Sequence, residues 1–211
     1  MTQAEILKIV EDTKIVPVVK IDRACDTIPL CQALIDGGLP IAEITFRTDA
    51  AEEAIKLASK TFPDMLVGAG TIVNVEQAKR AHAAGATFLV SPGFSRAVTE
   101  YAVANDLPIF PGCSTPTDIM AAMEYDLPVA KFFPAKQFGG LATIKAFAAA
   151  FPSMRFMPTG GIDASNINEH LAFGKIIACG GSWMVRGDLV DAGNFDEIRR
   201  LTKEAMDTVN S

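Results

Sequence analysis

A lysine stands inside an apolar segment of the chain, where a charged side chain is unexpected. Lys131 lies within Val129–Pro134, with apolar residues on both sides. Burial in such a segment disfavours the charged ammonium ion, because it removes the water that stabilises the charge. The neutral amine is the form that attacks a ketone to give an imine. Lys131 is therefore a candidate covalent nucleophile, and pairing with a core acid such as Glu43 is the structural alternative.

Three polar residues alternate with apolar ones in the segment Ile41–Arg47. Side chains of a strand point to alternate faces, so Glu43, Thr45 and Arg47 share one face. The carboxylate of Glu43 can transfer protons during a reaction, and the guanidinium of Arg47 can hold a carboxylate through two hydrogen bonds. The pattern predicts a polar face directed at a reaction site. A buried ion pair between Glu43 and Arg47 is the structural alternative.

Two glycine pairs follow late apolar segments, in Pro158–Ile162 and Cys179–Trp183. Glycine lets the backbone approach an anion closely, and free backbone N–H groups at helix starts bind phosphate. The sequence therefore predicts a phosphate-carrying substrate held near both pairs. The residues expected to bind substrate there and beside Lys131 are Thr159, Gly160, Gly161, Gly181, Ser182 and Phe133.

A few other residue types bear on the chemistry. Small residues in Gly68–Thr71 leave room near these candidates, and the hydroxyl of Thr71 can bind a carboxylate oxygen. Lys20 stands at the end of its segment and is followed by Ile-Asp-Arg, so we expect an exposed charge there. The two histidines, His82 and His170, lie in segments with helical spacing, so the sequence predicts neither a metal centre nor a cofactor.

The composition limits the class of protein. The chain has 211 residues, a net charge of −6 and 49% hydrophobic residues, which predicts one domain spanning residues 1–211. An acidic chain lacks the basic face that nucleic-acid binding requires, and no apolar run approaches the roughly 20 residues of a membrane span. The four cysteines have neither metal-site nor disulfide-scaffold spacing, so we expect a cytoplasmic protein.

Apolar segments alternate with segments of helical spacing along the whole chain. The apolar segments begin 20 to 27 residues apart and are Ile15–Lys20, Ile41–Arg47, Leu66–Ile72, Phe88–Pro92, Pro108–Ser114, Pro128–Pro134, Arg155–Gly160 and Ile176–Ser182. Strands that alternate with helices imply parallel pairing. Eight such units after an N-terminal helix predict a compact (β/α)8 TIM barrel, with the candidate residues at the carboxyl ends of its strands. A doubly wound sheet is the alternative, although no glycine-rich nucleotide-binding motif follows the first strand.

Six short motifs occur in order along the chain: AEITFRT (Ala42–Thr48), GAGT (Gly68–Thr71), SPG (Ser91–Gly93), KFFPA (Lys131–Ala135), PTGGI (Pro158–Ile162) and GGSW (Gly180–Trp183). In these motifs the sequence resembles the KDPG aldolases, which act on 2-keto-3-deoxy-6-phosphogluconate (KDPG) and on 4-hydroxy-2-oxoglutarate. The resemblance covers essentially the whole chain. It implies a cytoplasmic class I aldolase of the Entner–Doudoroff pathway, a homotrimer without a cofactor, that yields pyruvate and glyceraldehyde 3-phosphate.

The same resemblance implies roles for single residues. Lys131 would form the Schiff base with the substrate, and Glu43 would be the general acid and base. The remaining roles are binding ones: Arg47 and Thr71 would hold the pyruvate carboxylate, and Gly160, Gly161, Gly181 and Ser182 would hold the phosphate. Lys136 follows the KFFPA motif at a position where many relatives carry an acid. Two alternatives stay open: an aldolase for the epimeric 2-keto-3-deoxy-6-phosphogalactonate, and a phosphate-binding barrel that is not an aldolase.

Overall fold

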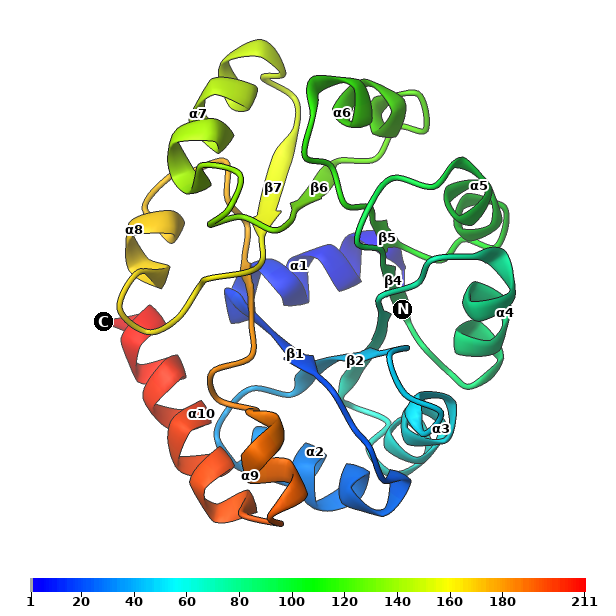
Figure 1. Ribbon diagram of the computed structural model, residues 1–211, viewed down its shortest axis with the longest axis vertical. Helices are drawn as coiled ribbons and strands as arrows, with labels where there is room; N and C mark the ends of the chain where they lie inside the picture. The colour runs from blue at the N-terminus through cyan, green and yellow to red at the C-terminus, as the bar shows by residue number, and fades with distance from the viewer. Residues whose placement is uncertain (1) are drawn as a thin grey trace.

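The computed structural model describes residues 2–211, in which short strands alternate with helices (Figure 1). The strands are β1 (Ile15–Val19), β2 (Ile41–Thr45), β3 (Leu66–Gly70), β4 (Phe88–Val90), β5 (Ile109–Phe110), β6 (Val129–Phe132), β7 (Arg155–Pro158) and β8 (Cys179–Gly181). The helices are α1 (Gln3–Thr13), α2 (Thr27–Asp36), α3 (Ala51–Thr61), α4 (Val75–Ala83), α5 (Arg96–Ala104), α6 (Pro116–Met123), α7 (Gly140–Ala150), α8 (Ile167–Leu171), α9 (Gly187–Asp191) and α10 (Phe195–Asn210). Across residues 2–211, no helix is both long and apolar enough to span a bilayer.

The strands pair in parallel, and helices surround them in the view of Figure 1. One curled sheet has the order β5-β4-β3-β2-β1-β8, and β6 pairs with β7 in a second sheet. Single bridges join the two sheets, from Gly112 to Lys131 on one side and from Thr159 to Gly180 on the other. The prediction of an α/β fold is confirmed in the form of a curled, six-stranded parallel sheet. The doubly wound alternative is wrong, because consecutive strands stay neighbours from β5 to β1.

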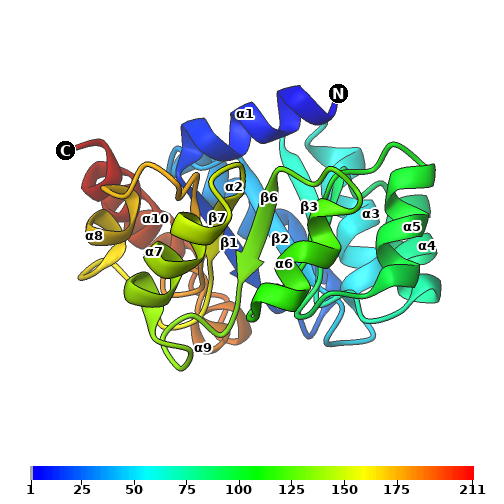
Figure 2. The ribbon, with the colours of Figure 1, turned by 90° about the horizontal axis from the view of Figure 1, so that it is seen from above.

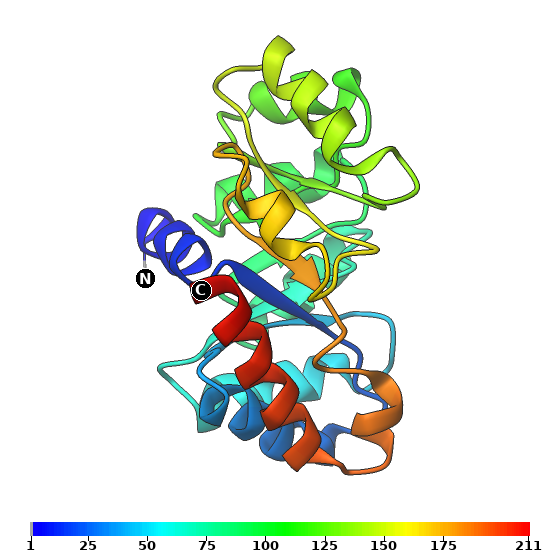
Figure 3. The same ribbon diagram turned by 90° about the vertical axis from the view of Figure 1, so that its left-hand side faces the viewer.

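Helix α1 lies across the end of the molecule where the strands begin (Figure 2). The end of α10 returns to the same side (Figure 3), where Nζ of Lys14 donates a hydrogen bond of 2.7 Å to the carbonyl of Val209. The loops that follow the strands lie at the opposite end. These loops carry Arg47 after β2 and Gly160–Gly161 after β7, so the candidate residues for substrate binding gather at one end of the fold.

Local capping chemistry accounts for several helix starts. The side chain of Asn74 accepts a hydrogen bond of 2.8 Å from the first turn of α4, and Thr115 caps α6 in a reciprocal capping box. Pro116 begins α6, where its missing N–H leaves no bond unmade. Thr48 does not cap α3; its hydroxyl donates to the carbonyl of Ile21 and so ties the loop after β2 to the loop after β1.

An aromatic ring occupies the space inside the curled sheet that a side chain at one glycine of β3 would fill. Gly68 of β3 pairs with Phe88 of β4, and a Cβ atom on Gly68 would overlap the Phe88 ring. That ring packs edge-to-face on Phe110 of β5, with ring centroids 5.7 Å apart. The missing side chain at Gly68 is therefore what admits Phe88 to the interior.

We expect Gly68→Ala to lower the free energy of unfolding by about 1–3 kcal/mol, because overpacking forces the fully buried Phe88 ring out of place. Urea denaturation followed by circular dichroism measures the change. Gly174→Ala is the matched control, because nothing lies within 4 Å of a Cβ atom at that position. Equal stability of the two variants would contradict this account of the packing.

Candidate active site

The interior holds an ion pair between two strands that are not neighbours in a sheet. Lys131 of β6 donates a hydrogen bond of 3.3 Å from Nζ to Oε1 of Glu43 on β2. Both side chains are almost fully buried, with exposed fractions of 6% and 1%. Because β2 and β6 belong to different sheets, only the curl of the fold brings these charges together. The pairing expected as the structural alternative for Lys131 therefore occurs, and it couples the candidate nucleophile to the candidate acid and base.

The neighbouring strand makes space for the Glu43 carboxylate. Gly70 ends β3, and a Cβ atom there would overlap Oε1 of Glu43. The other carboxylate oxygen, Oε2, is buried and has no hydrogen-bond partner among residues 2–211. Buried polar atoms normally have a partner, so Oε2 is a candidate contact for a bound molecule. From the sequence we expected only that the small residues of Gly68–Thr71 leave space. The alternation of side chains along a strand does, however, place Gly68 and Gly70 on the same face.

The other polar residues of the Ile41–Arg47 segment have different surroundings. Thr45 is buried and donates a hydrogen bond of 2.8 Å to the carbonyl of Val19 on β1, which is a structural role. Arg47 lies beyond the end of β2 with an exposed side chain. Within residues 2–211 no ion pair joins Glu43 to Arg47, because Glu43 pairs with Lys131 instead. The structural alternative for Glu43 and Arg47 is therefore wrong.

A polar cavity of about 160 Å³ lies near this ion pair, although neither Lys131 nor Glu43 lines it. It is lined by seven of the residues that the sequence predicted, namely Arg47, Phe133, Thr159, Gly160, Gly161, Gly181 and Ser182. Phe133 connects the cavity to the ion pair, since Nζ of Lys131 lies 5.4 Å from the centroid of its ring. A larger cavity of about 500 Å³ shares Arg47, Gly161 and Ser182 with the first. It is also lined by Lys20, Trp183 and Arg186, to which the sequence analysis gave no role in binding.

Thr159 presents a second buried oxygen atom without a partner. Its Oγ1 forms no hydrogen bond to any residue between 2 and 211. A Cβ atom on Gly180, the bridge partner of Thr159, would overlap this hydroxyl, and one on Gly181 would overlap the ring of Trp183. The glycines of β8 therefore make room for large or polar neighbouring side chains. The sequence predicted a different role for them, which is to let the backbone approach a phosphate closely.

Thr71 follows β3 in an unusual backbone conformation. Its φ of 56° lies in the left-handed region, where a β-branched side chain is strained. Strain of this kind costs about 1–3 kcal/mol and concentrates at functional sites. Thr71 lies outside the lining of both cavities but directly follows Gly70, the residue that makes room for Glu43. The sequence carries no signal for this strain, because threonine rarely adopts such a φ.

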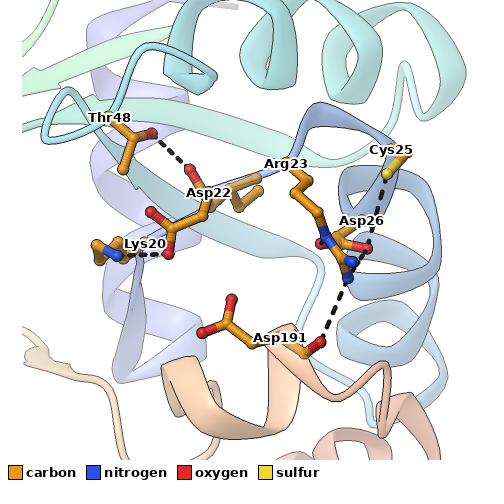
Figure 4. A network of polar contacts seen from close by, with 8 residues as sticks. Lys20, Asp22, Arg23, Cys25, Asp26, Thr48 and Asp191 are labelled. Carbon is orange, nitrogen blue, oxygen red and sulfur yellow. Dashed lines mark hydrogen bonds and ion pairs between the residues drawn. The ribbon is translucent and has the colours of Figure 1, made fainter.

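Lys20 follows β1 and forms an ion pair with Asp22 (Figure 4). Its side chain is 48% exposed, in agreement with the exposed charge expected from the sequence. In the same loop Arg23 binds the buried Asp26 at 2.8 Å and so holds the turn that leads into α2. Lys20 is thus held by its own loop at the surface, in contrast to Lys131.

Other reactive residue types lie apart from this chemistry. Burial raises the pKa of three free thiols to about 12, those of Cys31, Cys113 and Cys179. Their reactive thiolate form is therefore scarce near neutral pH. His82 and His170 lie in α4 and α8, as their helical spacing predicted.

Comparisons with known proteins point to one family. A family model for KDPG and KHG aldolases matches residues 6–201. The chain belongs to the KDPG and KHG aldolase family. It is 43% identical to the 2-dehydro-3-deoxy-phosphogluconate aldolase of Treponema pallidum over 204 residues, which are 97% of each chain. The family resemblance inferred from the sequence is confirmed.

Solved structures of KDPG aldolases share this fold. The KDPG aldolase of Legionella pneumophila is 34% identical, with a TM-score of 0.91 over 95% of this chain and 97% of that one, and it holds pyruvate as a covalent carbinolamine. The aldolase of Zymomonas mobilis is 36% identical, with a TM-score of 0.91 over 97% and 96% of the two chains, and it was solved with 3-phosphoglycerate. One relative thus binds a keto acid covalently and another binds a phosphorylated acid.

We expect Gly70→Ala to lower kcat for aldol cleavage by about 10²-fold, because the added Cβ atom displaces the Glu43 carboxylate from its position beside Lys131. Steady-state kinetics of the purified variant measure the loss. Glu43→Gln and the double variant Gly70→Ala with Glu43→Gln complete a double-mutant cycle. The losses of kcat in the two single variants should not add in the double variant, since both substitutions remove the same carboxylate from its position. Full additivity would show that Gly70 acts on something other than Glu43.

We expect Thr71→Gly and Thr71→Ala to separate backbone strain from hydroxyl chemistry. Both variants lose the hydroxyl, so both should raise KM for pyruvate in the condensation direction. Only glycine relieves the left-handed backbone, so Thr71→Gly should be more stable than Thr71→Ala by about 1 kcal/mol. Urea denaturation compares the two variants, and a less stable Thr71→Gly would refute the strain.

Proposed function

We propose that this chain is a class I aldolase that cleaves KDPG reversibly to pyruvate and glyceraldehyde 3-phosphate through a Schiff base on Lys131. The buried ion pair of Lys131 and Glu43, which is next to Phe133 in the lining of the polar cavity, is the observation that carries the proposal. Membership of the KDPG and KHG aldolase family supports it. The same chemistry applies to 4-hydroxy-2-oxoglutarate, which has a ketone and a hydroxyl group at the corresponding carbon atoms.

The proposed reaction begins with proton transfer inside the ion pair. Glu43 accepts a proton from Lys131 along the 3.3 Å hydrogen bond, and the neutral amine attacks the C2 carbonyl of the substrate. The protonated Glu43 returns this proton to the hydroxyl group of the resulting carbinolamine, which leaves as water. A protonated imine and the Glu43 carboxylate remain. This cation is the electron sink for the next step, because it accepts the electron pair of the C3–C4 bond.

Cleavage requires a base at the C4 hydroxyl group. Glu43 removes that proton, directly or through one water molecule, and its partner-free Oε2 is suited to the task. The C3–C4 bond breaks, glyceraldehyde 3-phosphate leaves, and an enamine of pyruvate remains on Lys131. Glu43 then returns a proton to C3, and hydrolysis of the imine releases pyruvate and the free amine.

The proposed binding roles divide the substrate between its two anionic ends. Arg47 and Thr71 hold the carboxylate, because a guanidinium and a hydroxyl group both donate hydrogen bonds to it. The phosphate and the hydroxyl groups next to it are held by Thr159, Gly160, Gly161, Gly181 and Ser182, with Phe133 packing against the chain of the substrate. The partner-free hydroxyl of Thr159 supports its part in this assignment.

We further propose that the two sheets close into an eight-stranded barrel, which forms one domain of residues 1–211. Backbone hydrogen bonds between β6 and the segment that follows β5 support closure on one side: the N–H of Lys131 donates to the carbonyl of Pro111 at 2.9 Å, and the N–H of Cys113 donates to the carbonyl of Lys131 at 2.8 Å. The bridge between Thr159 and Gly180 supports it on the other side. In such a barrel the carboxyl ends of the strands form the reaction site.

We also propose that the enzyme is a homotrimer that works in the cytoplasm. Exposed apolar side chains, among them Val73, Met120 and Phe138, support an interface between copies of the chain. The cysteines are free thiols, which is the state expected in a reducing compartment.

Borohydride trapping with pyruvate tests the covalent step. We expect a stable pyruvyl adduct on Lys131, read by intact mass and peptide mapping, and none in Lys131→Ala, which should have no turnover. The peptide that contains Lys20 is the internal control, since this lysine lies at the same end of the fold but is held by Asp22. No adduct, or an adduct on Lys20, would refute the mechanism.

Glu43→Gln tests the acid and base. We expect this variant to form the pyruvyl adduct in part but to cleave KDPG roughly 10²–10⁴-fold more slowly, which is the usual contribution of a positioned proton transfer. Single-turnover kinetics separate imine formation from cleavage. Cleavage at the wild-type rate would show that another group is the base.

A further inference from the structure

Four positively charged side chains lie near the loop Gly160–Gly161. Those of Lys20, Arg47 and Arg186 line a cavity that this loop also lines, and that of Lys136 contacts Gly161 without lining either cavity. Two of them, Lys20 and Arg186, are held in ion pairs by aspartates two residues further along the chain. Arg47 and Lys136 form no ion pair with any residue between 2 and 211. Because Arg47 is assigned to the substrate carboxylate, Lys136 is the free cation that remains near this loop.

Lys136 is in direct contact with the glycine loop. Its backbone N–H donates a hydrogen bond of 3.1 Å to the carbonyl of Gly160. Its Cβ and Cδ atoms would lie 2.5 and 2.8 Å from a Cβ atom added at Gly161, so the stem of the lysine occupies that space. The ammonium is two bonds beyond Cδ, which keeps its charge beside the loop. Gly161 lines both cavities of the candidate active site.

The acidic residue next to this loop does not neutralise Lys136. The carboxylate of Asp163 accepts hydrogen bonds of 2.5 and 2.8 Å from the hydroxyl and the backbone N–H of Ser165. These bonds, the hydroxyl first, lower the pKa of Asp163, and the charge of Lys136 lowers it further. Lys136 is thus close enough to act through its charge, yet its ammonium is not engaged by that carboxylate.

We propose that Lys136 is a specificity-determining residue that binds the phosphate group of the substrate and favours phosphorylated aldehydes over unphosphorylated ones. The assignment rests on the aldolase function proposed above. Backbone N–H groups of the loop can bind a phosphate or a hydroxyl group, whereas an ammonium adds an attraction that only the anion experiences. Lys136 therefore discriminates by charge, where the loop alone discriminates by shape.

The test compares two acceptor aldehydes in condensation with pyruvate, D-glyceraldehyde 3-phosphate and D-glyceraldehyde. For Lys136→Gln we expect the ratio of kcat/KM for the phosphorylated aldehyde to that for the unphosphorylated one to fall about three- to tenfold. The change should lie in KM for the phosphorylated aldehyde. Lys136→Arg keeps the charge and should restore the ratio. Lys79→Gln is the matched control, an exposed lysine on α4 outside both cavities.

Ionic strength provides a second readout that a merely structural role would not move. The wild-type ratio should fall as NaCl rises from about 0.02 M to about 0.5 M, because salt screens exposed charges. The same ratio of kcat/KM values, measured for the Lys136→Gln variant, should change less over this range of NaCl concentration.

Two outcomes would overturn the proposal. One is an unchanged ratio in Lys136→Gln at low salt, and the other is an equal loss on both aldehydes, which a structural role would produce. Failure of the wild-type enzyme to form a borohydride-stable pyruvyl adduct would instead overturn the aldolase function. The two failures are therefore distinguishable.

Discussion

The buried ion pair between Lys131 and Glu43 is the constraint on which the rest of this structure depends. Both charges have lost most of their hydration, and such a pair generally adds little net stability compared with apolar residues of the same volume. In the proposed mechanism its value is chemical, because it places a proton acceptor against the amine that must become neutral. The pair requires β2 and β6 to face each other across the interior. Since β6 lies outside the six-stranded sheet, both sheets must curl toward one another to form it.

Small residues admit the large and polar side chains that this interior needs. Three glycines each face a neighbour that would overlap a side chain: Gly68 faces Phe88, Gly70 faces Glu43, and Gly180 faces Thr159. Protein interiors are packed at crystal-like density, so both members of such a pair cannot be large. None of these three glycines has a positive φ, so space and not backbone freedom explains them. Gly161 differs, because its φ of 76° and the stem of Lys136 both exclude a side chain there.

Several features of the site were predictable from single residues and their spacing. Lys131 within an apolar segment indicated a buried amine, and the alternation in Ile41–Arg47 placed Glu43 on the inner face. Both side chains are buried in the interior. The sequence left two partners open for Glu43, namely Lys131 and Arg47, and no local pattern chose between them, because Lys131 is 88 residues away along the chain. Arg47 lies on the same face of the same segment and was an equally plausible partner by local pattern, yet its side chain extends to the surface.

By itself, the sequence determined the alternation of strands and helices, the polar face of β2, and membership of a family through motifs in a fixed order. These features depend on residues a few positions apart, whose propensities and hydrogen bonds are local. Only the tertiary structure decided which charges pair, which buried oxygen atoms lack a partner, and which glycine makes room for which side chain. It also decided the strained backbone of Thr71. These outcomes depend on packing between segments that are distant along the chain. The free energy of that packing cannot be inferred from residues that are close together in the sequence.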